Sequence, residues 1–230
     1  MALPKIKHPT YSVTIPSTGQ AITIKPFTVQ EEKILLMAKA SEKTEDIIAA
    51  VKQIITNSII EPVNVDKLST FDIEYLFVKL RSKSIGEVVE LEYTEPETQD
   101  VLKFKINLDD VEIVNNPDHK TKFNIHEDVG LSMRYPTLDE IRKIEESENQ
   151  DGAYSLLFEC IDMVYDTDNV YNDFTKQELQ DFVNTLPMDC MVKIKEFFDT
   201  MPSLQHTVKL KNKNGEIKEV VLKGLNSFFI

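Results

Sequence analysis

Residues 22–37 read ITIKPFTVQEEKILLM, and this stretch predicts a strand that leads directly into a helix. Ile22 and Ile24 alternate with polar residues, which is typical of a half-buried strand. Thr28 is followed three residues later by Glu31, the spacing of a capping box, in which each side chain accepts a hydrogen bond from the other residue's backbone amide. The stretch therefore predicts where the first strand ends and where the first helix begins.

The same arrangement recurs at residues 131–144, LSMRYPTLDEIRKI. There Thr137 and Glu140 repeat the spacing of Thr28 and Glu31. Such a repeat is expected if the chain arose by internal duplication. It is also expected if an unduplicated chain uses one capping chemistry twice, because that chemistry is general. The sequence leaves both explanations open.

Similar patterns predict helices flanked by β-hairpins along the whole chain. The expected hairpins pair residues 11–15 with 21–25, 87–94 with 101–108, 122–125 with 130–134, and 206–210 with 217–222. Four of the expected helices start at or near a capping residue: Thr28, Ser69, Thr137 and Thr175. Two more span residues 44–60 and run from Pro187 to about Phe198. A further helix is expected to carry Tyr154, Leu157, Phe158, Ile161 and Val164 on one face.

A cluster of turn-forming residues, Asn115-Asn116-Pro117-Asp118, separates two such series. We therefore expect an α+β fold of helices with peripheral β-hairpins. The domain prediction is two tandem, pseudo-equivalent halves, residues 1–115 and 116–230, each ordered hairpin, helices, hairpin.

Charge and hydropathy exclude several functions. The net charge of −13 and the pI near 4.8 disfavour binding to nucleic acid or to an anionic membrane, and they fit docking onto a basic protein surface. No segment approaches the roughly 20 apolar residues of a membrane-spanning helix.

Cys160 lies in an apolar pattern that predicts a buried free thiol. Cys190 is the only other cysteine in the sequence. Because two cysteines cannot form a disulfide framework, the sequence indicates a reducing, intracellular setting.

Motifs for catalysis, cofactors and metals are missing from the sequence. The four histidines lack metal-ligand spacing, and no glycine-rich phosphate loop or nucleophile elbow occurs. The acidic run from Asp166 to Tyr171 lacks the glycine of a calcium loop, so we interpret it as a solvated turn. We expect no catalytic residue, no cofactor and no metal, and therefore no enzyme.

The chain ends with three large apolar residues, Phe228, Phe229 and Ile230. Chain ends are usually polar and poorly ordered. These side chains either pack into the protein's own core or dock on a partner.

Scattered motifs over nearly the whole chain resemble the T4-type phage baseplate proteins, specifically the hub subunit or hub-assembly protein of contractile tails. The motifs are Leu3-Pro4, Pro9-Thr10-Tyr11, Ile15-Pro16-Ser17-Thr18-Gly19, Lys25-Pro26-Phe27-Thr28, Glu31-Glu32-Lys33, Lys52-Gln53-Ile54-Ile55, Leu80-Arg81-Ser82-Lys83-Ser84, Gly86-Glu87, Met133-Arg134-Tyr135-Pro136-Thr137, and Leu222, Gly224, Leu225 and Phe228-Phe229.

One feature of that family does not carry over. Its members often place cysteine pairs, suggestive of small zinc ribbons, in the hairpins that follow the helices. Here the turns at residues 94–100 and 211–216 contain no cysteine, so the resemblance implies no metal.

The resemblance implies a non-enzymatic baseplate hub protein or hub-assembly factor that acts through contacts with other hub or tail proteins. No nucleic acid, membrane span or small-molecule substrate is expected. The alternative is a transient chaperone of a hub or tail component that is absent from the finished virion. The expected location is the host cytoplasm during assembly, with the tail baseplate of the virion as a second location if the protein is retained.

Candidate partner contacts lie where strands lead into helices and at the C-terminus. They are Pro26, Phe27, Tyr135, Pro136, Phe228 and Phe229. The alternative for the first four is that they only shape the start of a helix.

Overall fold

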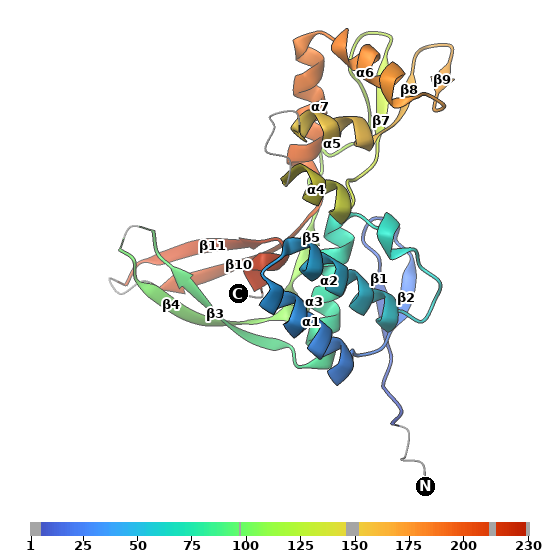
Figure 1. Ribbon diagram of the computed structural model, residues 1–230. Helices are drawn as coiled ribbons and strands as arrows, with labels where there is room; N and C mark the ends of the chain where they lie inside the picture. The colour runs from blue at the N-terminus through green and yellow to red at the C-terminus, as the bar shows by residue number, and fades with distance from the viewer. Residues whose placement is uncertain (1–5, 97, 146–151, 212–214, 229–230) are drawn as a thin grey trace. The chain divides into compact units, whose positions relative to one another are not determined.

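The computed structural model describes residues 6–96, 98–145, 152–211 and 215–228 (Figure 1). As expected, the fold is α+β, with helices and antiparallel sheets. The chain forms two compact units. Unit 1 comprises Met1–Val114 with Ser203–Ile230, and unit 2 comprises Asn115–Pro202.

Unit 1 begins with a hairpin and a group of helices. The elements are β1 (Tyr11–Thr14), β2 (Ala21–Ile24), α1 (Val29–Ser41), α2 (Thr44–Ser58), the 3₁₀ turn η1 (Val65–Lys67) and α3 (Thr70–Ser84). β1 and β2 pair antiparallel, and Gly19 in their turn has a φ of 69°, a conformation that glycine adopts without strain. The expected capping boxes at Thr28 with Glu31 and at Ser69 with Asp72 are both confirmed.

Asp72 does more than cap α3. Its carboxylate is completely buried and accepts hydrogen bonds from the Ser69 hydroxyl at 2.6 Å and the Ser69 amide at 3.1 Å. The second oxygen accepts from the backbone amide of Ser17 in the β1–β2 turn at 2.8 Å. One side chain therefore joins the first hairpin to the start of α3.

The rest of unit 1 is mainly β structure. It consists of β3 (Val88–Thr94), β4 (Val101–Asn107), η2 (Leu108–Asp110), β5 (Glu112–Val114), β10 (Ser203–Lys211), β11 (Ile217–Lys223) and η3 (Leu225–Phe228). β3 and β4 form a two-stranded sheet, and β11, β10 and β5 form a three-stranded sheet in that order. Both expected hairpins are present.

The last hairpin belongs to unit 1. β10 pairs with β5, with Ser203 opposite Val114, so the described residues from Ser203 onward pack with the first part of the chain. The first segment of unit 1 ends at Val114, next to the expected boundary at residue 115. Unit 2, however, ends at Pro202, whereas the expected second half runs to residue 230. The strand pattern of β10 does not specify its partner strand, and the three-residue β5 was not expected. A duplication of the two halves stays a prediction.

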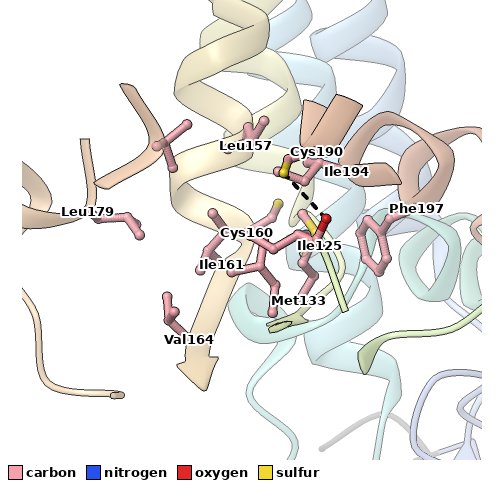
Figure 2. Close-up of a cluster of buried hydrophobic side chains, with 12 residues drawn as sticks. Ile125, Met133, Leu157, Cys160, Ile161, Val164, Leu179, Cys190, Ile194 and Phe197 are labelled. Atoms are coloured by element: carbon pink, nitrogen blue, oxygen red, sulfur yellow. Dashed lines mark hydrogen bonds between the residues drawn. The ribbon is translucent and has the colours of Figure 1, made fainter. Parts of the chain in front are cut away.

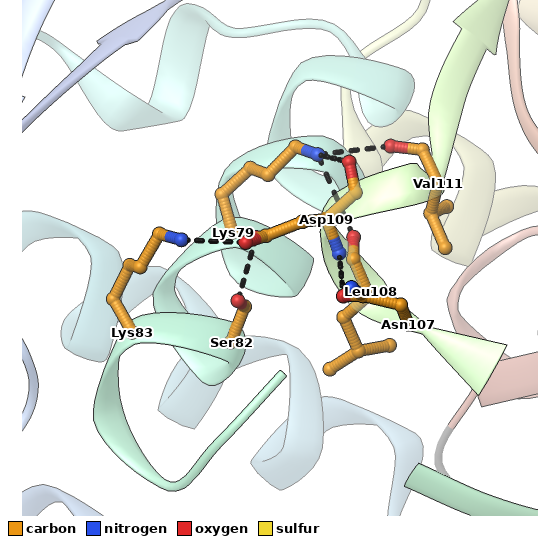
Figure 3. A network of polar contacts seen from close by, with 7 residues as sticks. All are labelled: Lys79, Ser82, Lys83, Asn107, Leu108, Asp109 and Val111. Carbon is orange, nitrogen blue, oxygen red and sulfur yellow. Dashed lines mark hydrogen bonds and ion pairs between the residues drawn. The ribbon is translucent and has the colours of Figure 1, made fainter. Parts of the chain in front are cut away.

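Lys79 of α3 fixes η2 and the start of β5 (Figure 3). Its ammonium group donates to the carbonyl oxygens of Asp109 at 2.8 Å, Val111 at 3.1 Å and Leu108 at 3.5 Å. The Asp109 carboxylate in turn accepts from the Ser82 hydroxyl and pairs with Lys83, both at 2.7 Å. Partial burial lowers the pKa of Lys79 below its ordinary value.

The described part of unit 2 contains one sheet and four helices. Its elements are β6 (Lys122–Asn124), β7 (Gly130–Met133), α4 (Leu138–Glu145), α5 (Gly152–Cys160), β8 (Ile161–Tyr165), β9 (Val170–Tyr171), α6 (Lys176–Asn184) and α7 (Met188–Thr200). The sheet order is β6-β7-β8-β9, all antiparallel. Side chains from the sheet and from α5, α6 and α7 form one buried cluster (Figure 2).

One helix prediction was wrong. The expected helix through Ile161 and Val164 ends at Cys160, and both residues lie in β8. Both residues pair with β7, which contains an irregularity between Ser132 and Met133, and their side chains are buried in the cluster of unit 2. Ile and Val favour strands, but the spacing of apolar residues alone suited either structure.

We expect Asp72→Ala to lower the free energy of unfolding by about 2–4 kcal/mol, because it leaves the buried donors of Ser69 and the backbone amide of Ser17 without their acceptor. Urea denaturation measures the loss. Asp46→Ala, at an exposed carboxylate in the first turn of α2, is the matched control and should cost a few tenths of a kcal/mol. Equal losses in the two variants would contradict the role given to Asp72.

Candidate protein-interaction surfaces

The first strand-to-helix connection is built into the fold. Phe27 is buried, and its backbone amide donates to the Ser84 hydroxyl of α3 at 3.0 Å. The next amide, that of Thr28, donates to the Glu31 carboxylate at 2.7 Å. Pro26 is half-buried. Phe27 therefore anchors the start of α1, and its ring offers a partner little surface.

The second connection has an ion pair in addition to its cap. The Glu140 carboxylate accepts from the Thr137 amide at 2.8 Å and from both terminal nitrogens of Arg134, at 3.0 and 2.7 Å. This bidentate pair raises the pKa of Arg134. Pro136 is buried and Tyr135 is half-buried, so this connection too is largely internal.

Tyr135 belongs to a group of aromatic rings in unit 2 that includes His119. The His119 ring lies 5.6 Å from the Tyr135 ring and 5.1 Å from the Phe197 ring, measured between centroids. Its Nε2 is 3.1 Å from the Tyr135 hydroxyl and its Nδ1 is 2.9 Å from the Thr200 hydroxyl. Burial lowers the pKa of His119, because partial removal from water disfavours the charged imidazolium.

The lowered pKa predicts a loss of stability in acid. Below about pH 6.5 the unfolded chain takes up a proton on His119 that the folded chain resists, so stability falls as the pH decreases toward the folded-state pKa. His119→Gln removes this titration. We expect its melting temperature, followed by circular dichroism from about pH 7.5 to about pH 5.5, to fall less than that of the unsubstituted protein. The other three histidines are present in both proteins, so parallel curves would contradict the prediction.

Both cysteines are buried free thiols. Figure 2 shows Cys160 and Cys190 among the side chains of the buried cluster of unit 2. The Cys190 thiol donates to the carbonyl oxygen of Ile125, with 3.4 Å between sulfur and oxygen. Burial raises the pKa of Cys160 to about 12, so its reactive thiolate is scarce at neutral pH.

We expect neither thiol of the folded protein to react with an aromatic disulfide reagent at neutral pH. Both should react once guanidinium chloride unfolds the chain, which is the positive control. Rapid labelling of a thiol under native conditions, followed by absorbance, would contradict the burial of these sulfurs.

The C-terminal segment packs into unit 1. Phe228 is 1% exposed and lies in a core cluster with Leu108 and Leu204. The Leu225 amide donates to the Glu74 carboxylate of α3 at 3.1 Å, and burial raises the pKa of Glu74. Phe228 therefore serves the core. Phe229 lies outside the described residues.

The most exposed apolar surface of α1 was not anticipated from the sequence. Val29, Leu36 and Met37 are 73%, 58% and 74% exposed. Their spacing of seven and eight residues places them on one face of the helix. We call this surface the α1 stripe. The signal was present in the sequence, but it was hidden because Ile34, Leu35 and Ala38 make the opposite side apolar too.

A groove of about 460 Å³ lies between the β3–β4 hairpin and β11. Its lining is made of consecutive residues of two strands, Glu90 to Tyr93 of β3 and Val220 to Leu222 of β11, with Phe104 and Ser227. β11 is an edge strand of its sheet, and among the described strands β3 pairs with β4 alone. At the end of the groove, Lys218 of β11 forms an ion pair with Glu95, which follows β3, and this pair lowers the pKa of Glu95.

An apolar pocket of about 320 Å³ lies in unit 2 between the β8–β9 hairpin and α6. We call it the α6 pocket. It is lined by Val129, Val164, Tyr165, Asp166, Tyr171, Phe174, Glu178, Leu179 and Phe182.

Among the described residues, no group of three or more histidines, cysteines or carboxylates is arranged to hold a metal ion. Within the same part of the chain, no helix combines the length and the apolar character needed to cross a lipid bilayer.

Comparison with known proteins gives a match to a family model. The model of the family described as T4 bacteriophage base plate protein matches residues 8–230. No curated protein and no solved structure matches the chain.

Proposed function

Because the chain belongs to the family of T4 bacteriophage base plate proteins, we propose that it is a hub protein or hub-assembly factor of the tail baseplate. It acts through contacts with other hub or tail proteins and carries out no chemical reaction. The family match supports a baseplate component, and the hub role is our own inference.

The observation that carries this proposal is the α1 stripe. Large exposed apolar side chains that gather on one helix face are typical of protein contact sites. Thr28 and Glu31 cap the start of α1, and the buried Phe27 anchors it. The stripe therefore lies on a helix whose start is held in place. A rigid surface loses little conformational entropy on binding. We assign the stripe to contact with a hub or tail protein of the same baseplate.

The groove between β3 and β11 offers a second mode of contact. Edge strands have backbone amides and carbonyls that an extended segment of another protein can pair with. The ion pair between Glu95 and Lys218 holds the two edges near each other at one end of the groove. Strand addition there fits the assembly of a many-protein complex.

A transient chaperone of a hub or tail component is the alternative function. The same exposed surfaces would then shield a partner and be released before the virion is complete. Mass spectrometry of purified virions separates the two, because a structural hub protein is present in the particle. Its absence from particles, with its presence in assembly intermediates, would establish the chaperone instead.

We expect Leu36→Gln combined with Met37→Gln to weaken binding to the baseplate partner at least about tenfold, because each exposed anchor side chain contributes on the order of 1 kcal/mol or more. Glutamine is a good helix former, so α1 should remain folded. The measurement is the yield of infectious particles when the variant protein complements a phage lacking the gene.

The matched control replaces Lys39 and Lys43, which are exposed on or next to the same helix, with glutamine. It should support a normal yield. If the double variant of the stripe also gives a normal yield and a normal protein composition of the baseplate, the stripe is not a contact surface.

A further inference from the structure

We infer that the groove between β3 and β11 receives an extended segment of a protein partner whose side chains alternate, apolar toward the core and basic toward solvent. The segment pairs with β3 on one side and with β11 on the other, so it joins the two sheets of unit 1 into one. The inference rests on the proposed function and names the kind of partner that the groove fits.

The backbone of β11 alternates between β10 and its free edge. The Gly224 amide donates to a carbonyl oxygen of β10 at 3.0 Å. Lys223 bonds away from β10, because its amide donates to the Ser227 hydroxyl at 3.2 Å and its carbonyl oxygen accepts from that hydroxyl at 2.7 Å. In an antiparallel ladder every second residue faces the same way. The amides and carbonyls of Val221 and Glu219 therefore also face the free edge.

The backbone of β3 alternates in the same manner. The Glu95 amide donates to the carbonyl oxygen of Asp100 across the β3–β4 hairpin at 2.9 Å, so the odd-numbered residues of β3 bond toward β4. The amides and carbonyls of Glu90 and Glu92 face the other way. Among the described residues that line the groove, none belongs to β10 and Phe104 alone belongs to β4. The groove therefore lies along the free edges of both bordering strands.

The two bordering strands run antiparallel along the groove. Leu91 and Leu222 line it and lie in one core cluster, and four residues further along each strand, in opposite directions, Glu95 pairs with Lys218. Both hairpins extend in the same direction from the helices of unit 1 (Figure 1).

The two ends of the groove limit the length of an occupant. The ion pair between Glu95 and Lys218 closes one end, and Ser227 covers the edge of β11 at the other. Between these ends β11 spans about 17 Å at roughly 3.3 Å per residue, the length of a segment of about five residues. A volume of about 460 Å³ also lies within the range of sites that hold peptide-sized ligands.

The lining sets the side-chain pattern of the segment. Side chains that point toward the core alternate along both strands with exposed ones, as the period of two requires. The inner set, buried or half-buried, is Leu91, Tyr93, Phe104, Val220 and Leu222, and the exposed set is Glu90, Glu92 and Val221. A strand that lies between them buries every second side chain against the inner set, so these side chains should be apolar.

The exposed faces of both hairpins carry carboxylates on the strand that borders the groove and lysines on the paired strand farther from it. The pairs are Glu90 with Lys105 at 3.8 Å, Glu92 with Lys103 at 2.7 Å and Glu219 with Lys209 at 3.2 Å. An inserted strand places its outward side chains beside these carboxylates, on the side away from the lysines. Opposite charges at cross-strand positions stabilise a sheet and like charges destabilise it, so basic residues fit there.

The preference for basic residues is local. The residues of unit 1 contain 18 lysines and arginines against 20 aspartates and glutamates, a net charge of −2, whereas residues 115–202 contain 8 against 19, a net charge of −11. Long-range attraction by unit 1 is therefore small. The pattern of the segment should decide binding, and its total charge should matter less.

The test is amide hydrogen exchange, followed by NMR, of the full-length protein with a synthetic eight-residue peptide of alternating lysine and valine. At about ten times the dissociation constant of the peptide, exchange of the Glu92 and Val221 amides should slow about tenfold. Two control peptides should give no measurable protection at the same concentration. One has the same composition in blocks of two lysines and two valines, and the other alternates glutamate and valine.

Three results would overturn the inference: no protection by the lysine–valine peptide, equal protection by either control peptide, or protection of only one of the two amides. Self-association of the purified protein that protects the same amides without peptide would overturn it too, in favour of a second copy of the chain as the occupant.

Two substitutions of Val221 test the backbone contact. Val221→Pro removes the amide at the free edge, where proline is tolerated, and should weaken binding of the lysine–valine peptide at least about tenfold. Val221→Thr keeps the amide and a β-branched side chain, and it should bind within about twofold of the unsubstituted protein. Equal binding by the two variants would contradict backbone pairing.

Glu92→Gln tests the opposite wall without altering the backbone, and it should weaken binding several-fold. Its matched control is Asp46→Asn, at an exposed carboxylate of α2 outside the groove lining. An equal loss in both variants would refute the local charge preference. These measurements use the isolated protein and the virion experiment uses particles, so failure of the groove inference leaves the baseplate function to be decided by its own measurement.

Discussion

The polar contacts of α3 are the constraint on which the rest of unit 1 depends. Asp72 holds the β1–β2 turn, Glu74 holds the C-terminal segment, Lys79 holds η2, and Ser84 holds the start of α1. Each contact joins α3 to a segment far away in the sequence. Since a buried polar group without a partner costs free energy, these contacts favour one arrangement of the segments over other compact ones. The apolar cluster adds most of the stabilisation, but it is less selective between arrangements.

The two units differ in the kind of surface they present. Unit 1 is almost neutral overall and presents apolar and edge-strand surfaces, namely the α1 stripe and the groove between β3 and β11. Unit 2 is strongly acidic and presents the apolar α6 pocket. Apolar burial contributes affinity, whereas charge contributes specificity and the rate of association. A protein of this kind is suited to contact more than one neighbour in an assembly.

Local patterns predicted most of the elements, because capping boxes and hairpin turns involve residues close in sequence. Thr28 with Glu31 and Thr175 with Glu178 are examples. Pairing between distant strands was not predicted: β10 joins β5, and Ile161 lies in β8. Dependence on residues distant in sequence also explains why the burial of the candidate contact residues was not predicted. Phe27, Pro136 and Phe228 are apolar in sequence, but only tertiary packing shows that they are buried. The α6 pocket combines two hairpins and a helix, so no single motif indicated it.

The pairing of Ser203 with Val114 has a topological consequence. Unit 2 begins just after β5 and ends just before β10, so its two chain ends are neighbours in one sheet of unit 1. It is an inserted domain, connected to its host by two adjacent strands. Insertions of this kind can be exchanged as cassettes, because a new sequence needs only two ends that lie close together to leave the host sheet intact. Residues 115–202 can therefore change in sequence without altering the strands of the scaffold that carries them.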